Sequence, residues 1–219
     1  MNKQFPGNLP TDDIPFGHSQ REAMRLASRQ FSASDIPARC QAVGAVLEGQ
    51  VISLPFMGKP LTLRLPGLEF SLAGEACGVP LWLQVLALHH LNTSDGSTPT
   101  GELVAFRNLP GGQVYHSNFE KRVSQRLARE FGKAPSRLVE AARRLGGAEV
   151  HAGDKGAVVS AFPRVPLTMV VWKADEEFAA SGSVLLDSTV LGHLPIEDVV
   201  VTAQEAVSYL VREARPLRS

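Results

Sequence analysis

The order of helix-like and strand-like patterns is the feature that most restricts the fold of this chain, because the same order occurs twice. A helix, a shorter helix, a group of strands and a further helix are predicted over residues 18–91 and again from Gln113 to the C-terminal region. Within the strand groups, Val51-Ile52-Ser53 corresponds to Val158-Val159-Ser160. We therefore expect an α+β fold of two similar, pseudo-duplicated halves around one mixed or antiparallel sheet, with a cleft between the lobes. The alternative is a coincidence among common residues.

In the first half, turn residues divide a strand-rich segment that precedes a buried helix. Residues 45–72 are largely apolar but are interrupted by Pro55, Gly58 and Pro60, which favours short strands and turns. Val79–Leu91 is too continuous for a half-exposed helix and too long for one strand, so it predicts a buried helix.

In the second half, the periodicity changes from helical to strand-like and back again. Large apolar residues recur every four positions over 115–131, which predicts a helix. Strands are predicted over 150–161, 167–174 and 184–187. The helix that begins at Pro195 has the most regular apolar spacing in the chain.

These patterns predict a simple domain organisation. Residues 1–17 contain proline, glycine and aspartate with no period, and we expect a flexible N-terminal arm. Residues 18–219 form a single α+β domain in this interpretation, with lobes over 18–100 and 101–219.

Charge and cysteine content narrow the range of partners and compartments. The 219 residues carry 22 basic and 22 acidic side chains, and this net charge of zero argues against nucleic acid and membrane as partners. The apolar run Val79–Leu91 is shorter than the roughly 20 residues of a membrane span. The polar N-terminus has no signal-peptide pattern, so we expect a cytoplasmic protein with Cys40 and Cys77 reduced. Two cysteines cannot form the usual four-cysteine cage of an iron–sulfur cluster.

Carboxylates at predicted strand ends form the first candidate site. Asp154 lies in a turn, Asp175 and Glu176 follow one predicted strand, and Asp187 ends another. If these four side chains converge at one sheet edge, they could bind a divalent cation or act as a general acid and base. The alternative is that they are solvated turn residues and helix caps.

A glycine turn before a helix forms the second candidate site. Pro-Gly at Gly111 suits a type II turn, and Gly112 leads into a helix whose free N–H groups could hold an anion, with Arg107 as its ion-pair partner. Tyr115 and His116 follow at once, and His116 is the preferred histidine for an axial ligand to a tetrapyrrole metal. The alternative is a plain structural turn. The segment is neither a phosphate-binding loop nor a dinucleotide fingerprint.

Several motifs in a fixed order carry a resemblance to a known family. They are Ile52-Ser53-Leu54-Pro55-Phe56-Met57-Gly58-Lys59-Pro60, Phe106-Arg107-Asn108-Leu109-Pro110-Gly111-Gly112, Leu145-Gly146-Gly147, Gly153-Asp154, Trp172, Asp175-Glu176-Glu177-Phe178 and Leu185-Leu186-Asp187. Their combination, over most of residues 40–213, resembles a prokaryotic domain family of unknown function. Its members are often fused to a four-cysteine iron–sulfur module like that of corrinoid iron–sulfur proteins. The resemblance implies a setting in anaerobic redox or one-carbon metabolism, a corrinoid-type cofactor and an iron–sulfur protein as partner, since this chain lacks the cysteine module.

Three hypotheses about function follow. The leading one is a non-catalytic binding or accessory protein that holds a small anionic ligand or a corrinoid between its lobes. The second is an enzyme that uses a divalent metal held by the clustered carboxylates. The third is a structural subunit of an iron–sulfur redox complex, and a homodimer is kept as a further alternative.

Overall fold

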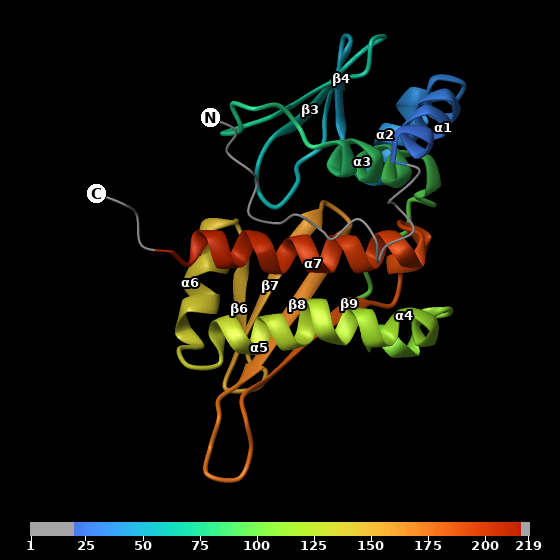
Figure 1. Cartoon of the computed structure of the whole chain (residues 1–219). Helices are drawn as coiled ribbons and strands as arrows, with labels where there is room; N and C mark the ends of the chain where they lie inside the picture. Colours follow the sequence, from blue (N-terminus) through green and yellow to red (C-terminus); the bar gives the residue numbers. More distant parts are fainter. Residues whose placement is uncertain (1–19, 216–219) are drawn as a thin grey trace.

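The computed structural model describes residues 20–215, and its two halves lie one above the other in Figure 1. The predicted arm over residues 1–17 lies outside the described residues. The elements of the first half are α1 (Gln20–Ser32), α2 (Ile36–Val43), β1 (Val46–Glu48), β2 (Val51–Ser53), β3 (Leu61–Arg64), β4 (Glu69–Leu72) and α3 (Leu81–Thr93).

The second half contains a larger sheet and longer helices. Its elements are β5 (Leu103–Ala105), the 3₁₀ turn η1 (Phe106–Asn108), α4 (Gly112–Phe119), the π-helical turn η2 (Glu120–Ser124), α5 (Gln125–Phe131), α6 (Ser136–Arg144), β6 (Ala148–Val150), β7 (Lys155–Phe162), β8 (Val165–Trp172), β9 (Ser181–Asp187), the 3₁₀ turn η3 (Val190–Gly192) and α7 (Ile196–Glu213).

The strands form two separate antiparallel sheets, so the prediction of one sheet shared by both halves is wrong. The first sheet has the order β1-β2-β3-β4, and the second has the order β5-β9-β8-β7-β6. Short connections explain this result, because consecutive strands joined by tight turns pair with each other before they can reach the other half. The order of helices followed by a four-stranded meander and a further helix recurs in both halves. The duplication itself stays a prediction.

One face of the larger sheet packs on helices. Val159, Leu167 and Leu186 are paired across β7, β8 and β9, and all three are buried. Helices α5, α6 and α7 contact these strands, and α5 and α7 cross in front of the sheet in Figure 1. Burial of such a row of aliphatic side chains contributes about 1.5–3 kcal/mol for each side chain, so the sheet and the helices stabilise each other.

A proline-rich loop joins the two halves. The loop between β2 and β3 places Phe56 against Phe162 and Tyr209, with ring centroids 5.2 and 5.5 Å away. The Met57 N–H donates to the Ala161 carbonyl over 3.0 Å. A single cluster of buried apolar residues therefore runs through both halves.

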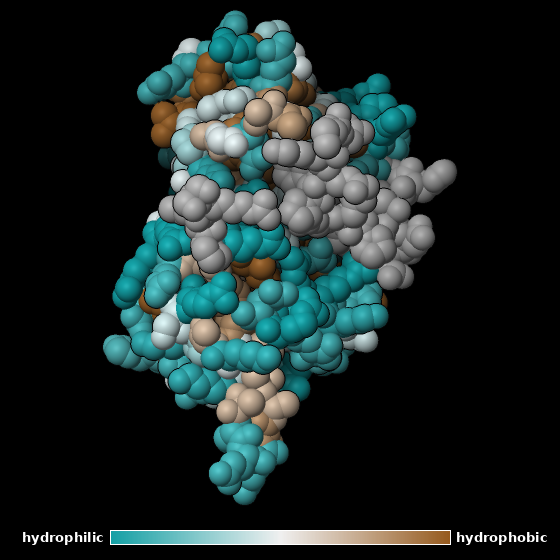
Figure 2. Space-filling view, turned by 60° about the vertical axis from the view of Figure 1, so that its left-hand side comes forward, coloured by the Kyte–Doolittle hydropathy of each residue, from teal (hydrophilic) through white to brown (hydrophobic). Residues whose placement is uncertain are grey.

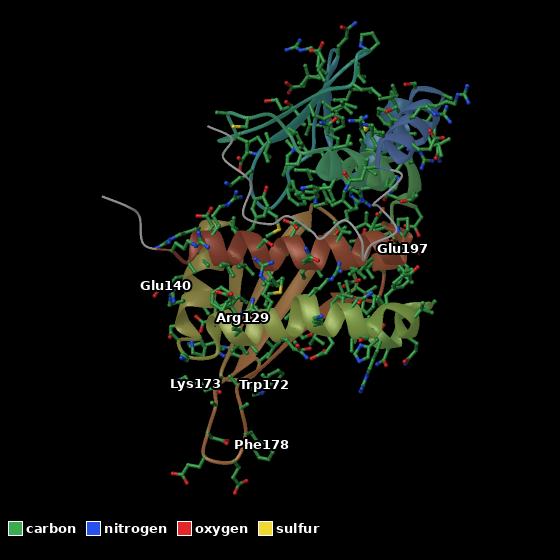
Figure 3. The ribbon with its side chains drawn as sticks, in the orientation of Figure 1. Arg129, Glu140, Trp172, Lys173, Phe178 and Glu197 are labelled. Atoms are coloured by element: carbon green, nitrogen blue, oxygen red, sulfur yellow. The ribbon has the colours of Figure 1, made fainter. Side chains whose placement is uncertain are left out.

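A hairpin projects from the lower end of the larger sheet. The connection between β8 and β9, residues 173–180, extends beyond the helices in Figures 1 and 3, where Phe178 is labelled near its tip. Phe178 is 69% exposed and Trp172, at its base, is 42% exposed. In Figure 2 the tip of this hairpin is hydrophilic, and hydrophilic residues predominate over the lower half on the face shown. No helix within residues 20–215 is both long and apolar enough to cross a membrane.

Candidate functional site

The glycine turn is formed as the sequence predicts. Gly111 has φ 79° and ψ −10°, and the Gly112 N–H donates to the Leu109 carbonyl over 2.8 Å, which is the geometry of a type II turn. A Cβ on Gly112 would lie 2.1 Å from the carbonyl oxygen of Phe106, so only glycine fits. The turn thus directs the chain from η1 into α4.

The five residues predicted around this turn do not share one site. The Tyr115 hydroxyl donates to Glu197 of α7 over 2.7 Å, so it fastens α4 to α7. Arg107 and His116 line a pocket of about 260 Å³, whereas Gly111 and Gly112 are not part of its lining. The Nδ1 atom of His116 is buried and has no hydrogen-bond partner.

The four predicted carboxylates lie at two different ends of the sheet. Asp175 and Glu176 are exposed in the projecting hairpin, and Asp154 lies near the same end, where it accepts a 2.7 Å hydrogen bond from the Lys173 N–H. Asp187 is the last residue of β9, at the opposite end of that strand, and it is 1% exposed. Among the residues that the structure describes, no group of three or more His, Cys, Asp or Glu side chains could hold a metal ion.

Backbone N–H groups also donate to Asp187 and Asp175. Asp187 accepts from the N–H groups of Thr100, Gly101 and Thr189 over 3.2, 2.7 and 3.0 Å. Burial alone would raise the pKa of Asp187, but these hydrogen bonds and one from the Thr189 hydroxyl together hold it below its usual range. Asp175 accepts from the N–H groups two and three residues ahead, which holds the pKa of that carboxyl below its usual range. Both side chains therefore act as turn caps.

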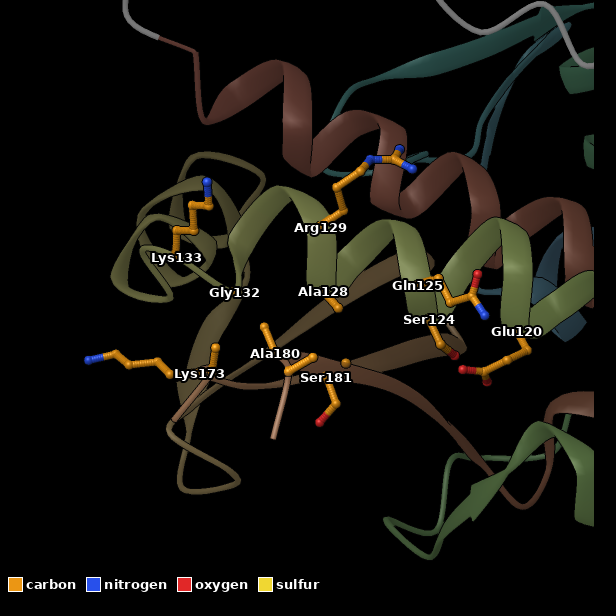
Figure 4. Close-up of a pocket in the computed structure, with 13 residues that line it drawn as sticks. Glu120, Ser124, Gln125, Ala128, Arg129, Gly132, Lys133, Lys173, Ala180 and Ser181 are labelled. Carbon is orange, nitrogen blue, oxygen red and sulfur yellow. The ribbon is translucent and has the colours of Figure 1, made fainter. Parts of the chain in front are cut away.

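A cavity lies between the helix formed by η2 and α5 and the start of β9. It has a volume of about 740 Å³, and its lining is Glu120, Ser124, Gln125, Ala128, Arg129, Gly132, Lys133, Lys173, Ala174, Ala179, Ala180, Ser181 and Gly182. Figure 4 shows Ser124 and Ala128 pointing from the helix toward Ala180 and Ser181. Lys133 and Lys173 extend outward at its rim.

Small residues let the helix lie close to the strand at this point. A Cβ on Gly182 would come within 3.0 Å of the Ser124 carbonyl oxygen and of the Ala128 nitrogen. A Cβ on Gly132 would lie 2.4 Å from the Ala180 side chain. The π-helical turn η2 inserts an extra residue here, and such turns are frequent at functional sites.

The two cavities are neighbours and form one feature, which we call the β9 groove. Glu120 and Ser124 belong to both linings. Arg107 and His116 lie in the smaller part, and Arg129, Lys133 and Lys173 line the larger part. Glu120 is the one carboxylate in either lining, so basic groups predominate along the groove.

The lining of the groove carries groups that can bind an anion. The larger part is lined by hydroxyl, amide and basic groups, by backbone and by the carboxylate of Glu120. Exposed Lys and Arg side chains at a rim attract and position an anion.

From the sequence alone, the acidic residues interspersed around Arg129 and Lys133 are typical of a solvated helix face. Both residues are indeed exposed, but the helix carries them to the rim of a cavity. The missed signal is the small-residue pattern of Ala128, Gly132 and Gly182, which allows the helix to approach the strand.

A second polar cluster lies buried where the two halves meet. His89 Nδ1 lies 2.6 Å from an oxygen of Asp198, and His193 Nδ1 lies 2.9 Å from the Ser94 hydroxyl. His90 stacks on Phe162 at a centroid distance of 4.6 Å. Adjacent histidines on one helix therefore reach different partners, as their angular separation predicts.

The pKa values of the two histidines of α3 are shifted in opposite directions. The hydrogen bond to Asp198 raises the pKa of His89, whereas burial lowers the pKa of His90 to about 3. His90, Ser94 and His193 are at most 2% exposed, so a substrate in solution cannot reach them. We interpret the cluster as a structural contact that holds α3 against α7.

Comparison with known proteins identifies the family. A family model described as Domain of unknown function (DUF3786) matches residues 35–209. Since this match covers most of the chain, the protein belongs to that family. No curated protein and no solved structure matches the chain significantly.

Proposed function

We propose that this chain is a non-catalytic binding protein that holds an anionic ligand in the β9 groove. The observation that supports this proposal is the excess of basic groups over the single carboxylate, Glu120, in the groove lining. Lys133 and Lys173 are exposed at the rim of the groove, where they can attract and position an anionic ligand.

Titration with inorganic pyrophosphate tests the proposal. We expect the backbone amide signals of residues 124–133 and 173–182 to shift in NMR spectra, with an affinity that falls as salt increases. The double variant Lys133→Glu/Lys173→Glu should bind about tenfold more weakly. Arg21→Glu is the matched control, because Arg21 is exposed on α1 in the other half. Equal affinity in wild type and double variant would contradict the proposal.

A corrinoid is the second candidate ligand, and one observation favours it. The buried Nδ1 atom of His116 has no hydrogen-bond partner, so this nitrogen is available to donate an electron pair to the metal of a corrinoid. The corrinoid, the iron–sulfur partner and the one-carbon setting otherwise depend on the family resemblance. Titration with cobalamin, followed by its visible absorption, should show a spectral change in wild type that is lost in His116→Ala. An identical response in both proteins would remove His116 from this role.

A further inference from the structure

Only part of the outer edge of β9 in the larger sheet is paired with another strand. β9 pairs with β8 from Ser181 to Leu186, but β5 pairs with β9 only at Leu185, Leu186 and Asp187. The turn η1 then carries the chain away from the sheet. Within residues 20–215, β9 therefore has no strand on its outer side over residues 181–184.

The hydrogen-bonding alternation of β9 shows which groups face this open side. The Ser188 N–H donates to the Glu102 carbonyl over 2.8 Å, so residue 188 faces the β5 side. Alternate residues of an antiparallel strand face the same neighbour, so Leu186, Val184 and Gly182 also face that side. β5 pairs with Leu186, which leaves the N–H and C=O groups of Val184 and Gly182 directed at the position of a missing strand.

The β9 groove occupies this position. Its smaller part is bounded by Ala105, where β5 ends, and by Val184, and its larger part reaches Gly182. The groove thus continues the line of β5 along β9. The side chains at this stretch of edge, Ser181 and Ser183, carry no charge that would repel an added strand.

We propose that the β9 groove receives an extended acidic segment of a partner polypeptide, which adds to the sheet as a strand beside Gly182 and Val184. The inference rests on the proposed function, because the same basic groups that attract an anion select acidic side chains. The backbone of the segment pairs with the open edge, and its carboxylates reach Arg107 at one end and Lys133 and Lys173 at the other. Since every strand pair in the sheet is antiparallel, we expect the segment to run antiparallel to β9, as β5 does.

Amide hydrogen exchange with a synthetic probe tests the inference. The probe is an eight-residue peptide of alternating glutamate and valine with blocked ends. We expect it to slow exchange at the amides of Gly182 and Val184 about tenfold or more, while the amide of Ser183, which faces β8, does not change. The control peptide has the same sequence with N-methyl groups on its central peptide bonds, which removes its backbone donors. It should bind at least about tenfold more weakly.

The outcomes separate this inference from the proposed function. Binding of the probe without protection at Gly182 and Val184, or equal binding of the N-methylated peptide, would overturn strand addition. Pyrophosphate binding without any peptide binding would also overturn it, while leaving the proposed function intact. If the protein binds neither pyrophosphate nor the peptide, both the inference and the proposed function are overturned. We expect the Lys133→Glu/Lys173→Glu variant to bind the peptide more weakly than the wild type. The control variant Arg21→Glu should bind the peptide as tightly as the wild type.

Discussion

Replacement of Asp187 by asparagine should destabilise the protein strongly, although the side chain keeps its shape. One carboxylate oxygen, Oδ1, accepts from the N–H groups of Thr100 and Thr189 and from the Thr189 hydroxyl, and the other, Oδ2, accepts from the Gly101 N–H. An asparagine amide has one acceptor oxygen, so in either orientation its NH₂ group faces at least one backbone donor.

The size of the effect follows from these contacts. A hydrogen bond to a charged group contributes about 1.5–3 kcal/mol, and a buried donor left without a partner costs about 1–3 kcal/mol. Asp187→Asn removes the bond to Gly101 and weakens the others, so we expect the free energy of unfolding to fall by about 3 kcal/mol. In a chain of this size that corresponds to a decrease in Tm of about 6–12 °C.

Thermal unfolding at two pH values checks both the magnitude and its origin. Because the folded-state pKa of Asp187 is lowered, its carboxylate contributes stability that is present above the unfolded pKa of about 3.9 and is lost as the pH falls through the folded pKa. The difference between wild type and Asp187→Asn should therefore be full at pH 7 and should shrink in strong acid. Glu176→Gln, in the exposed hairpin, is the matched control and should change stability by less than about 0.5 kcal/mol. A variant Tm within about 2 °C of wild type at pH 7 would refute the reasoning.

Three further predictions concern single positions. Asp198→Asn should lower the pKa of His89, measured by NMR titration of the imidazole, to 6.5 or below; a pKa that stays raised would exclude Asp198 as its cause. Gly112→Ala should lower the free energy of unfolding by about 2–3 kcal/mol, because the new Cβ overlaps a backbone carbonyl oxygen. Gly67→Ala, whose new Cβ would meet only the Glu69 side chain at 3.6 Å, should have little effect, and comparable denaturation midpoints for the two variants would contradict this account. In the native protein, maleimide should modify Cys77, which is exposed, and should leave the second, buried cysteine unmodified; two adducts per chain would contradict the burial.

The elements with strong local signals were predictable from the sequence. The type II turn at Gly111 and the C-terminal helix from Ile196 to Glu213 both follow from local residue chemistry, and both are present. Strand boundaries were less accurate. β9 begins at Ser181 rather than near 184, because Gly182 and Ser183 have low strand propensity and are held in the ladder by pairing with β8.

The candidate site was predicted only in part, for a physical reason. Arg107 and His116 lie in the groove, but Lys173 comes from a hairpin far along the chain. No local pattern reports which hairpin approaches which helix, since that depends on the register of β8 and β9. The carboxylates were expected to meet at one edge, yet the length of β9 separates Asp175 from Asp187.

The π-helical turn Glu120–Ser124 limits which small deletions the gene can tolerate. Each residue of a helix advances its direction by about 100°, so loss of one codon in this turn would rotate all of α5 relative to α4. Leu127 and Phe131 would leave the interior, although the outer surface of that helix is polar. An in-frame loss from the projecting hairpin would only shorten a loop. Natural variation in chain length should therefore occur in the hairpin rather than in the helix beside it.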